Sequence, residues 1–242
     1  MKEERAQQTV LITGAAVRVG REIALALASD GWNVAIHYHK SKTQAEELAK
    51  LIRDKGRTAF TVQADLCNPE QVANIFPALA KQGASVDCLI NNASVFEKDN
   101  LTGLTPESWK LHMDVNLFAP LQLTRDFAAQ YSGSSGNVIN LTDGLVGWSV
   151  SSGFLSYALS KSGLAEATRM LSRELAPRIR INAIALGPTL EGKQDKPDTY
   201  AKLRKIIPLA RTSSPQEVCD TVRYILGAPS FTGQVISLAG GM

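Results

Sequence analysis

Residues 10–20, near the amino end, read Val10-Leu11-Ile12-Thr13-Gly14-Ala15-Ala16-Val17-Arg18-Val19-Gly20. The apolar run predicts a short buried strand, and the small residues after it predict a tight turn that opens a helix. Glycine and alanine let backbone N–H groups approach a phosphate, and the helix N-terminus adds partial positive charge. The pattern is not a strict GxGxxG, because Arg18 stands where many nucleotide-binding turns have glycine. A tight turn without a ligand is the alternative interpretation.

Short apolar runs alternate with longer amphipathic stretches along the chain. The predicted strands are Val10–Thr13, Asn33–Tyr38, Thr58–Val62, Cys88–Asn91, Asn137–Leu141, Arg180–Leu186 and Gln234–Leu238. The predicted helices are Arg21–Ser29, Lys42–Lys55, Glu70–Lys81, Pro106–Gln130, Phe154–Leu175 and Pro215–Leu226. This alternation predicts an α/β fold, a doubly wound parallel sheet of about seven strands with helices on both faces. In such a sheet, ligands bind beyond the carboxyl ends of the strands.

Length and composition favour one globular domain over residues 1–242. The chain is 44% apolar and 20% charged, which excludes wholesale disorder and fibrous structure. The net charge is +3, too small to indicate nucleic acid but suited to a small anionic ligand. Three cysteines without a CxxC spacing indicate reduced thiols, with no disulfide frame and no zinc site. The polar start and the lack of a long apolar run predict a cytoplasmic protein without a membrane segment.

The region after the sixth predicted strand is irregular. Gly187–Pro197 is polar and interrupted by glycine and proline, and we expect a substrate loop around residues 187–210. Its place at the functional edge of the sheet predicts a lid over a site. An ordinary surface connection is the alternative.

The end of the second strand points to the cofactor. His37-Tyr38-His39-Lys40-Ser41 has no acidic residue to accept from a ribose 2′-OH, and the next acid is Glu46. Cations and hydroxyls there, with Arg18 from the neighbouring turn, suit a 2′-phosphate and therefore NADPH. A solvated basic helix start is the alternative. His37 and His39 alternate along a strand without a third ligand, so we expect no metal site.

Tyr157 and Lys161 lie four residues apart on a predicted helix and hence on one face. A phenol has a pKa near 10, and a neighbouring ammonium favours the phenolate, so we expect Lys161 to bring Tyr157 closer to working pH. The spacing is weak alone, because Tyr38 and Lys42 share it at a strand end.

Residues that follow other strands complete the candidate site. Asn92, Ala93 and Ser94 follow the fourth strand and can line a cofactor cleft. Asn116 lies inside a predicted helix, where its amide could tether a water or the lysine, or be purely structural. The segment Gly187-Pro188-Thr189 could hold a nicotinamide carboxamide through backbone groups.

Over essentially its whole length the chain resembles a short-chain dehydrogenase/reductase. The matching pieces, in family order, are Thr13-Gly14 with Gly20, Ala64-Asp65-Leu66, Asn91-Asn92-Ala93, Asn116, Tyr157 with Lys161, and Asn182 to Gly187. The resemblance implies a Rossmann fold, a nicotinamide cofactor and a catalytic Asn, Ser, Tyr and Lys. It also implies a homotetramer or dimer built on Pro106–Gln130 and Phe154–Leu175.

Four details resemble the pteridine reductases within that family. They are Arg18 in the first turn, the stretch His37 to Ser41, the segment Ser94-Val95-Phe96, and Asp143 where most relatives have the catalytic serine. An ionised aspartate can only accept hydrogen bonds, so it would repel a developing alkoxide. It suits a substrate with N–H donors or a protonated C=N bond. Phe96 could stack on a flat ring, with core filling as the alternative.

The chain also departs from the family pattern. Asp143 and Tyr157 lie fourteen positions apart, one more than is usual, so either the loop is longer or Gly144 takes the serine position. Leu186 replaces a usual proline, and Ala239 replaces the aspartate of an Asp-Gly-Gly segment. Trp148 falls in the altered loop, where it either caps the substrate or packs.

The resulting hypothesis is NADPH-dependent reduction of a C=N bond in a pteridine, such as a dihydropterin or dihydrofolate. The predicted catalytic residues are Asn116, Asp143, Tyr157 and Lys161. The predicted substrate contacts are Arg18, Ser94, Phe96, Asp143 and Tyr157. The predicted cofactor contacts are Gly14, Arg18, Val19, Gly20, Tyr38, His39, Lys40, Ser41, Ala64, Asp65, Leu66, Asn92, Ala93, Ser94, Tyr157, Lys161, Gly187, Pro188 and Thr189. The alternatives are a carbonyl reductase, acting on a 3-oxoacyl thioester or another ketone, and a non-catalytic nucleotide-binding protein.

Overall fold

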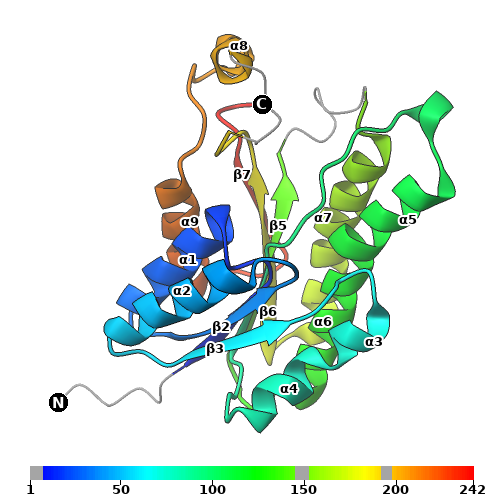
Figure 1. Cartoon of the computed structure of the whole chain (residues 1–242). Helices are drawn as coiled ribbons and strands as arrows, with labels where there is room; N and C mark the ends of the chain where they lie inside the picture. The colour runs from blue at the N-terminus through cyan, green and yellow to red at the C-terminus, as the bar shows by residue number, and fades with distance from the viewer. Residues whose placement is uncertain (1–7, 145–152, 192–197) are drawn as a thin grey trace.

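The structure, a computed structural model, describes residues 8–144, 153–191 and 198–242 and is built on one parallel seven-stranded sheet (Figure 1). Its strand order is β3-β2-β1-β4-β5-β6-β7. The strands are β1 (Thr9–Ile12), β2 (Asn33–Tyr38), β3 (Ala59–Gln63), β4 (Cys88–Asn91), β5 (Gly136–Asp143), β6 (Ile179–Leu186) and β7 (Val235–Leu238). The order reverses between β1 and β4, where doubly wound sheets form their ligand crevice.

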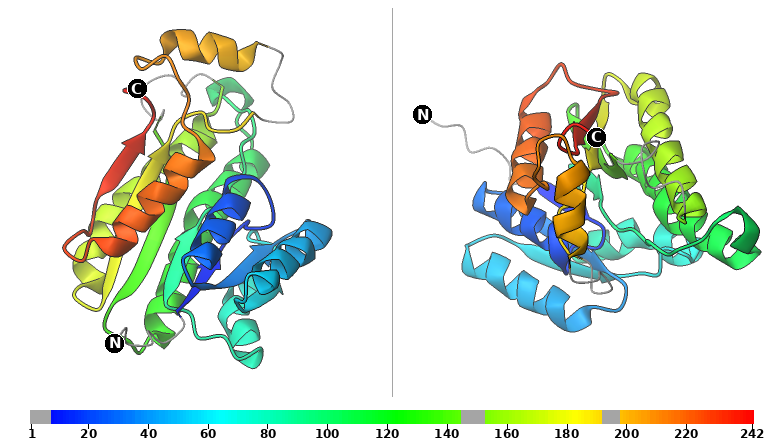
Figure 2. Two further views of the ribbon diagram at one scale, coloured as in Figure 1. Left: turned by 90° about the vertical axis from the view of Figure 1, so that its left-hand side faces the viewer. Right: turned by 90° about the horizontal axis from the view of Figure 1, so that it is seen from above.

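Helices cover both faces of the sheet, as Figures 1 and 2 show. One layer contains α1 (Arg18–Ser29), α2 (Lys42–Asp54) and α9 (Pro215–Gly227). The other contains α3 (Pro69–Ala73), α4 (Ile75–Lys81), α5 (Pro106–Met113), α6 (Ala119–Gln130) and α7 (Leu155–Leu175). The predicted Rossmann-type fold is therefore confirmed.

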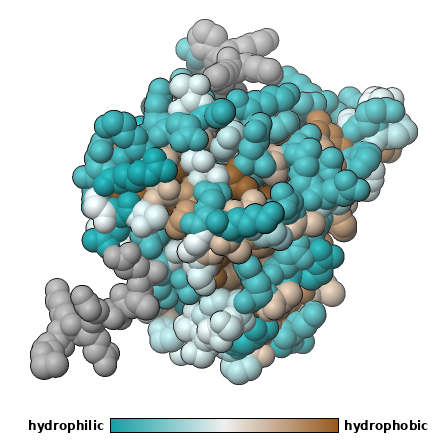
Figure 3. Space-filling model, turned by 60° about the horizontal axis from the view of Figure 1, so that its bottom comes forward, coloured by the Kyte–Doolittle hydropathy of each residue, from teal (hydrophilic) through white to brown (hydrophobic). Residues whose placement is uncertain are grey.

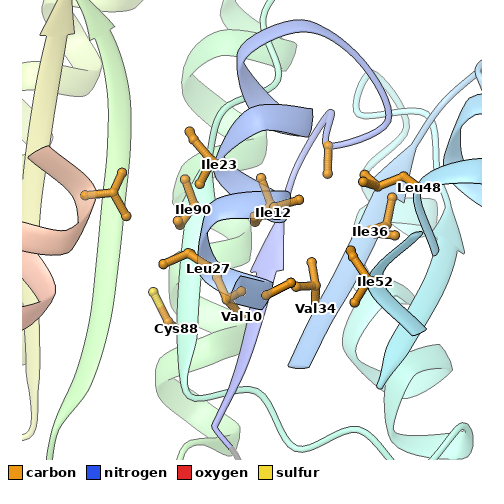
Figure 4. Packing of buried hydrophobic residues seen from close by; sticks show 14 of the residues in the cluster. Val10, Ile12, Ile23, Leu27, Val34, Ile36, Leu48, Ile52, Cys88 and Ile90 are labelled. Atoms are coloured by element: carbon orange, nitrogen blue, oxygen red, sulfur yellow. The ribbon is translucent and has the colours of Figure 1, made fainter. Parts of the chain in front are cut away.

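The core follows from the alternation of side chains along the strands. Val10 and Ile12 pack with the α1, α2 and α9 layer, together with Val34 and Ile36 of the neighbouring strand (Figure 4). Leu11, between Val10 and Ile12, packs into the second cluster on the opposite face. Continuous burial of β1 and β2 explains why these strands are apolar throughout, as expected for a sheet covered on both sides.

Two predicted helices are each divided in the structure. The helix predicted over Glu70–Lys81 is broken at Asn74, which ends α3 and precedes α4. The helix predicted over Pro106–Gln130 contains a π-helical turn, η2 (Asp114–Phe118), between α5 and α6. Pro120 follows this turn, and a proline lacks the N–H that would bond four residues back, so the regular pattern is interrupted there.

Two short elements were not predicted from the sequence. The 3₁₀ turn η1 (Leu101–Gly103) follows β4, and α8 (Thr199–Ile206) lies within the region predicted as a substrate loop. Helix α8 sits above the carboxyl edge of the sheet, near the C-terminus (Figures 1 and 2). Residues 192–197 of the predicted lid and Trp148 lie outside the described residues, so neither prediction is decided.

The opposite end of the molecule, at the amino ends of the strands, is mostly hydrophilic, with smaller apolar areas between (Figure 3). Within residues 8–144, 153–191 and 198–242, no helix is both long and apolar enough to cross a membrane. The same part of the chain holds no group of three or more His, Cys, Asp or Glu side chains arranged for a metal ion.

Candidate active site

Asp143 and Tyr157 meet at the carboxyl edge of the sheet. Asp143 is the last residue of β5, and Tyr157 lies in the first turn of α7. The Tyr157 hydroxyl donates a 2.6 Å hydrogen bond to Oδ2 of Asp143. Strand β5 extends two residues beyond the predicted Leu141, which is what brings the carboxylate to the end of the strand beside the phenol.

The position that faces Tyr157 is occupied by Asp143 and not by Gly144. Its N–H donates to the carbonyl of Leu186, and a Cβ added there would lie 2.8 Å from the Ala239 Cβ and 3.0 Å from the Ala185 oxygen. A side chain at 144 therefore has no room without displacement of β6 or the Ala239 backbone. Of the two alternatives left open by the sequence, the structure selects Asp143.

The Tyr157 phenol is buried and protonated. Burial raises its pKa well above the ordinary value of about 10, and the Asp143 charge and hydrogen bond raise it further. The expectation that the pKa of Tyr157 lies closer to working pH is wrong in this structure, because burial, and to a lesser extent the Asp143 carboxylate, oppose ionisation of the phenol. A neutral phenol at neutral pH holds a proton that it can donate to a reacting nitrogen or oxygen.

Lys161 is buried one helical turn further along α7, and its ammonium donates a 2.8 Å hydrogen bond to the Leu141 carbonyl. Burial lowers the pKa of Lys161 to about 8, against the opposing effect of the Asp143 charge. The side chain is therefore cationic at neutral pH and loses its charge under mildly alkaline conditions.

Asn116 organises the segment that carries Ser94 and Phe96. It lies in η2 and is fully buried. Its oxygen accepts from the Val95 N–H (2.9 Å) and the Ser94 hydroxyl, and its amide donates to the Val95 carbonyl and the Ser160 hydroxyl. These hydrogen bonds connect residues 94–95 to Ser160 of α7. The expectation was a bond from Asn116 to a water or to Lys161, and the described hydrogen bonds of Asn116 do not include one to Lys161.

Phe96 is not a core residue, so the core-filling alternative is wrong. Its side chain is 57% exposed, although it lies against two aromatic rings. It stacks on Phe154 with centroids 4.3 Å apart and planes within 6°, and it meets the edge of Tyr157 at 4.6 Å. An aromatic side chain that is more than half exposed thus lies directly beside the phenol.

Asp99 lies outside α7, the helix that carries Tyr157, and caps the N-terminus of that helix. Phe154, at the N-cap position of α7, makes no side-chain cap. Instead, the buried Asp99 carboxylate accepts a 3.0 Å hydrogen bond from the Ser156 N–H, and the Asp99 carbonyl accepts from the Leu155 N–H. Burial opposes ionisation of Asp99, but the hydrogen bonds from Ser156 hold its pKa below the ordinary value.

Replacing Asp99 with alanine is expected to destabilise the protein by about 1–2 kcal/mol, the usual effect of removing a helix cap. The Asp99→Asn variant keeps an acceptor oxygen and should lose less. Urea unfolding of the three proteins measures the difference. Because the pKa of the Asp99 carboxyl is lowered, the electrostatic part of its contribution to stability is fully present above the ordinary pKa of about 4. This part is lost as the pH falls through the lowered pKa. Equal stability of wild type and Asp99→Ala would exclude the cap.

The turn between β1 and α1 is closely packed against the residues after β4. Gly14 has φ +63°, a conformation that favours glycine, and a Cβ there would lie 3.1 Å from the Ala93 Cα. A Cβ on Gly20 would lie 2.6 Å from both the Asn92 amide and the Gly14 oxygen. Both positions therefore favour glycine, because neighbouring atoms lie too close for a Cβ.

The Thr13 hydroxyl accepts from the N–H groups of Asn92 (2.9 Å) and Ala93 (3.0 Å). The Asn92 amide donates to the Thr13 carbonyl at 2.7 Å. These bonds join the predicted phosphate turn to the predicted wall of the cleft, so Thr13 contributes to the site although it was not among the predicted contacts.

Arg18 joins the same turn to the loop after β6. Its guanidinium donates to the carbonyls of Leu190 and Glu191, each at 2.9 Å. Its φ is +55°, which explains why many nucleotide-binding turns have glycine at this position. Strain of this kind, ~1–3 kcal/mol, tends to persist at functional sites. The predicted substrate loop therefore contacts the phosphate turn directly.

The residues predicted for a 2′-phosphate lie where β2 ends and α2 begins. Tyr38 is the last residue of β2, and Ser41 precedes the first turn of α2. His39 lies 3.8 Å from the Asp65 carboxylate, and Lys40 is exposed. The structure brings together the two predicted groups at residues 38–41 and 64–66, since β2 and β3 are paired neighbours.

The remaining predicted contacts lie at the same edge. Val19 is in the first turn of α1, beside Arg18. The Gly187 N–H donates to the Leu238 carbonyl, the Pro188 carbonyl accepts from the Ser213 N–H, and the Thr189 hydroxyl donates to the Gly187 carbonyl. The backbone after β6 is thus fixed by β7 and by the start of α9.

Sequence reasoning missed two buried histidines. His37 bonds to the phosphate turn, and His112 accepts from the Glu97 N–H at 3.2 Å while its other ring nitrogen bonds to the Ser108 carbonyl. A polar residue in the otherwise apolar run Val34–Tyr38 was the available signal for His37. His112 gave no comparable signal, because helical histidines are usually solvated.

Comparison with known proteins agrees with this geometry. Residues 14–242 match the family described as enoyl-(acyl carrier protein) reductase. The 3-oxoacyl-(acyl-carrier-protein) reductase FabG of Staphylococcus epidermidis is 33% identical over 241 residues, covering 97% of this chain and 98% of that protein. The structure of FolM alternative dihydrofolate reductase 1 from Brucella canis, complexed with NADP, superposes with a TM-score of 0.92 and 39% identity, covering 98% and 94% of the two chains. The angucycline C-6 ketoreductase LanV with bound NADP superposes with a TM-score of 0.89 and 31% identity, covering 97% and 95%.

Proposed function

Since the chain belongs to the short-chain dehydrogenase/reductase family and is an NADP-dependent oxidoreductase, we propose that it reduces a C=N bond of a pteridine, a dihydropterin or dihydrofolate. The observation that carries the proposal is the 2.6 Å hydrogen bond between Tyr157 and a carboxylate, Asp143, at the end of β5. The similarity to a solved dihydrofolate reductase with bound NADP supports it.

The cofactor site suits NADP(H). The Gly14 turn and the start of α1 receive the pyrophosphate, while His39, Lys40 and Ser41 at the start of α2 receive the 2′-phosphate. Lys161, whose ammonium donates to the Leu141 carbonyl in this structure, would hold the nicotinamide ribose. When bound, NADPH supplies the hydride that reduces the carbon of the C=N bond.

The chain's own residues orient the substrate and deliver the proton. A carboxylate offers about four acceptor positions, so Asp143 accepts from Tyr157 and from an N–H of the heterocycle. Phe96 stacks on one face of the flat ring, and Tyr157 donates its proton to the nitrogen of the reduced bond. The substrate therefore gains one hydride and one proton, two electrons in all.

The proposal is tested by product identification. Incubation of the purified protein with NADPH and dihydromonapterin, dihydrobiopterin or dihydrofolate is expected to yield a product heavier by two hydrogens, with equimolar NADPH oxidation. Mass spectrometry and the loss of NADPH absorbance measure both quantities. Absence of a tetrahydro product from all three substrates would refute the proposal.

A carbonyl reductase acting on a 3-oxoacyl thioester is the second candidate, because the Staphylococcus reductase aligns over nearly the whole chain. Asp143 argues against it. A carboxylate beside the phenol repels the alkoxide that forms when a ketone is reduced, whereas a hydroxyl would stabilise it. A non-catalytic role is disfavoured by the buried Tyr157–Lys161 pair.

Removal of the cationic side chains near the predicted 2′-phosphate site should weaken the binding of NADPH more than the binding of NADH. Lys40→Ala combined with Arg18→Ala is expected to raise the Kd for NADPH at least tenfold, since two charge-assisted contacts each contribute ~1–3 kcal/mol. The Kd for NADH should change much less. Fluorescence titration of the two nucleotides gives both constants, and Lys42→Ala serves as a nearby control. Equal losses for both nucleotides would contradict a 2′-phosphate site.

The proposed assembly is a homotetramer built on α5, η2 and α7. Trp109, Phe118, Leu159 and Met170, which lie on these elements, expose large apolar side chains, between 38% and 67% of each. Apolar side chains gathered on paired helices favour association. Light scattering is expected to give four times the mass of one chain, and a monomer at micromolar concentration would contradict this prediction.

A further inference from the structure

His37 connects the turn after β1 to the segment after β3, two segments that line the proposed cofactor site. It lies in β2 and is 1% exposed. Its Nδ1 accepts a 3.1 Å hydrogen bond from the Gly14 N–H, and its Nε2 lies 3.2 Å from the Ala64 carbonyl. An amide N–H only donates and a carbonyl only accepts, so the proton resides on Nε2. The ring is therefore a bridge with a fixed donor and a fixed acceptor.

The bridge requires a neutral imidazole. Burial lowers the pKa of His37 to about 4, the Ala64 carbonyl opposes this effect, and His39 adds to the lowering. A protonated ring would place a second N–H against the Gly14 N–H. The side chain thus remains a hydrogen-bond acceptor toward the turn throughout the neutral range.

The backbone at this point reinforces the same connection. The Ala15 N–H donates to the His37 carbonyl at 3.0 Å, and the Ala64 N–H donates to the Tyr38 carbonyl at 3.1 Å. Two successive N–H groups of the turn, at residues 14 and 15, are therefore held by one residue of β2. Gly14 also has a positive φ, a conformation open to few residues other than glycine, so the hydrogen bond to its N–H constrains a flexible backbone position.

We infer that His37 is a positioning residue for NADPH, whose ring fixes the Gly14 turn against Ala64 before the nucleotide binds. The inference rests on the proposed cofactor site and goes beyond it, because backbone groups engage both ring nitrogens of the buried His37. A turn held in its binding conformation loses less entropy when the pyrophosphate arrives. The expected signature is a change in nucleotide affinity without a change in the chemical step.

A matched pair of variants separates the two hydrogen bonds. In His37→Asn the amide oxygen takes the place of Nδ1 and keeps an acceptor for Gly14, while the bond to Ala64 is lost. In His37→Gln the longer side chain reaches the Ala64 carbonyl with its amide N–H, and the acceptor for Gly14 is lost. His37→Phe keeps the ring and removes both bonds.

The measurement is the Kd for NADPH of the full-length protein, by isothermal titration, together with the KM for NADPH and kcat. His37→Gln and His37→Phe are expected to raise Kd and KM about tenfold, the effect of one unsatisfied buried N–H, with kcat at saturating NADPH unchanged. His37→Asn should remain within about threefold of wild type. Thermal melting verifies that each variant is folded.

Three results would overturn the inference. They are wild-type affinity in His37→Gln, equal losses in the Asn and Gln variants, or a fall in kcat with KM for NADPH unchanged. If His37→Phe does not fold, the Asn and Gln variants still decide the question. Since NADPH binding is measured without substrate, failure here is distinct from failure of the pteridine proposal.

Discussion

Replacing Tyr157 with phenylalanine is expected to reduce kcat by ~10²–10⁴-fold, the usual contribution of a positioned general acid. In the proposed mechanism the buried Tyr157 phenol, held protonated by its raised pKa, is the proton donor beside the end of β5. Phenylalanine keeps the ring that packs nearly perpendicular to Phe96, so the packing of the site should be retained. The Kd for NADPH should stay near the wild-type value.

Steady-state kinetics with a dihydropterin, and titration with NADPH, measure the two quantities. Tyr38→Phe is the matched control, because it removes a phenol that also has a lysine four residues later but lies at the end of β2. It should leave kcat nearly unchanged. A Tyr157→Phe enzyme with full turnover would show that another group supplies the proton.

Asp143 gives the second large effect, because in the proposed mechanism it determines which substrates the enzyme reduces. The Asp143→Ser variant is expected to lose pteridine turnover by ~10²-fold or more, as the charged acceptor for a donor on the substrate is replaced by a shorter, neutral hydroxyl. The same variant should gain activity toward 3-oxoacyl thioesters, since a hydroxyl can donate to a developing alkoxide. Parallel kcat/KM measurements on both substrate classes detect the exchange.

The Asp143→Asn variant tests the electrostatic coupling of Asp143 to Tyr157 and Lys161. Asp143 raises the pKa of both Tyr157 and Lys161, so its loss should lower both. Lys161 is cationic below its pKa of about 8, and the alkaline limb of the kcat profile should therefore move to lower pH in the variant. An unchanged limb, or a shift to higher pH, would contradict the coupling.

The fold was largely predictable because its pattern is local. Seven buried apolar runs alternated with amphipathic helices, and this pattern allows few arrangements other than a parallel doubly wound sheet. The interruptions of helices were not predictable in the same way. Pro120, for example, removes one particular backbone hydrogen bond, which apolar periodicity does not register.

The candidate site was predictable in its residues but not in its connections. The sequence placed Asp143 and Tyr157 in one site, but only β5 extending to Asp143, and the absence of space at Gly144, decides which residue faces the phenol. The protonation state of Tyr157 depends on burial and on the carboxylate, neither of which follows from a four-residue spacing.

The roles of Asp99 and His37 depend on contacts between segments far apart in the chain. The Asp99–Ser156 and His37–Gly14 hydrogen bonds span 57 and 23 residues. Neither residue belongs to a motif that spacing alone would reveal. Their partners are backbone groups, which every residue has, so the sequence contains no matching signal at the other end of the bond.

The account depends most on the claim that a carboxylate beside the phenol selects a nitrogen heterocycle over a ketone. The most direct test is the ratio of kcat/KM for a dihydropterin to that for acetoacetyl thioester, measured with wild-type protein and saturating NADPH. A ratio of ~10² or more in favour of the dihydropterin is predicted, because a ketone offers Asp143 no N–H donor and its developing alkoxide is repelled by the carboxylate. A ratio below one would contradict the claim and assign the protein to carbonyl reduction.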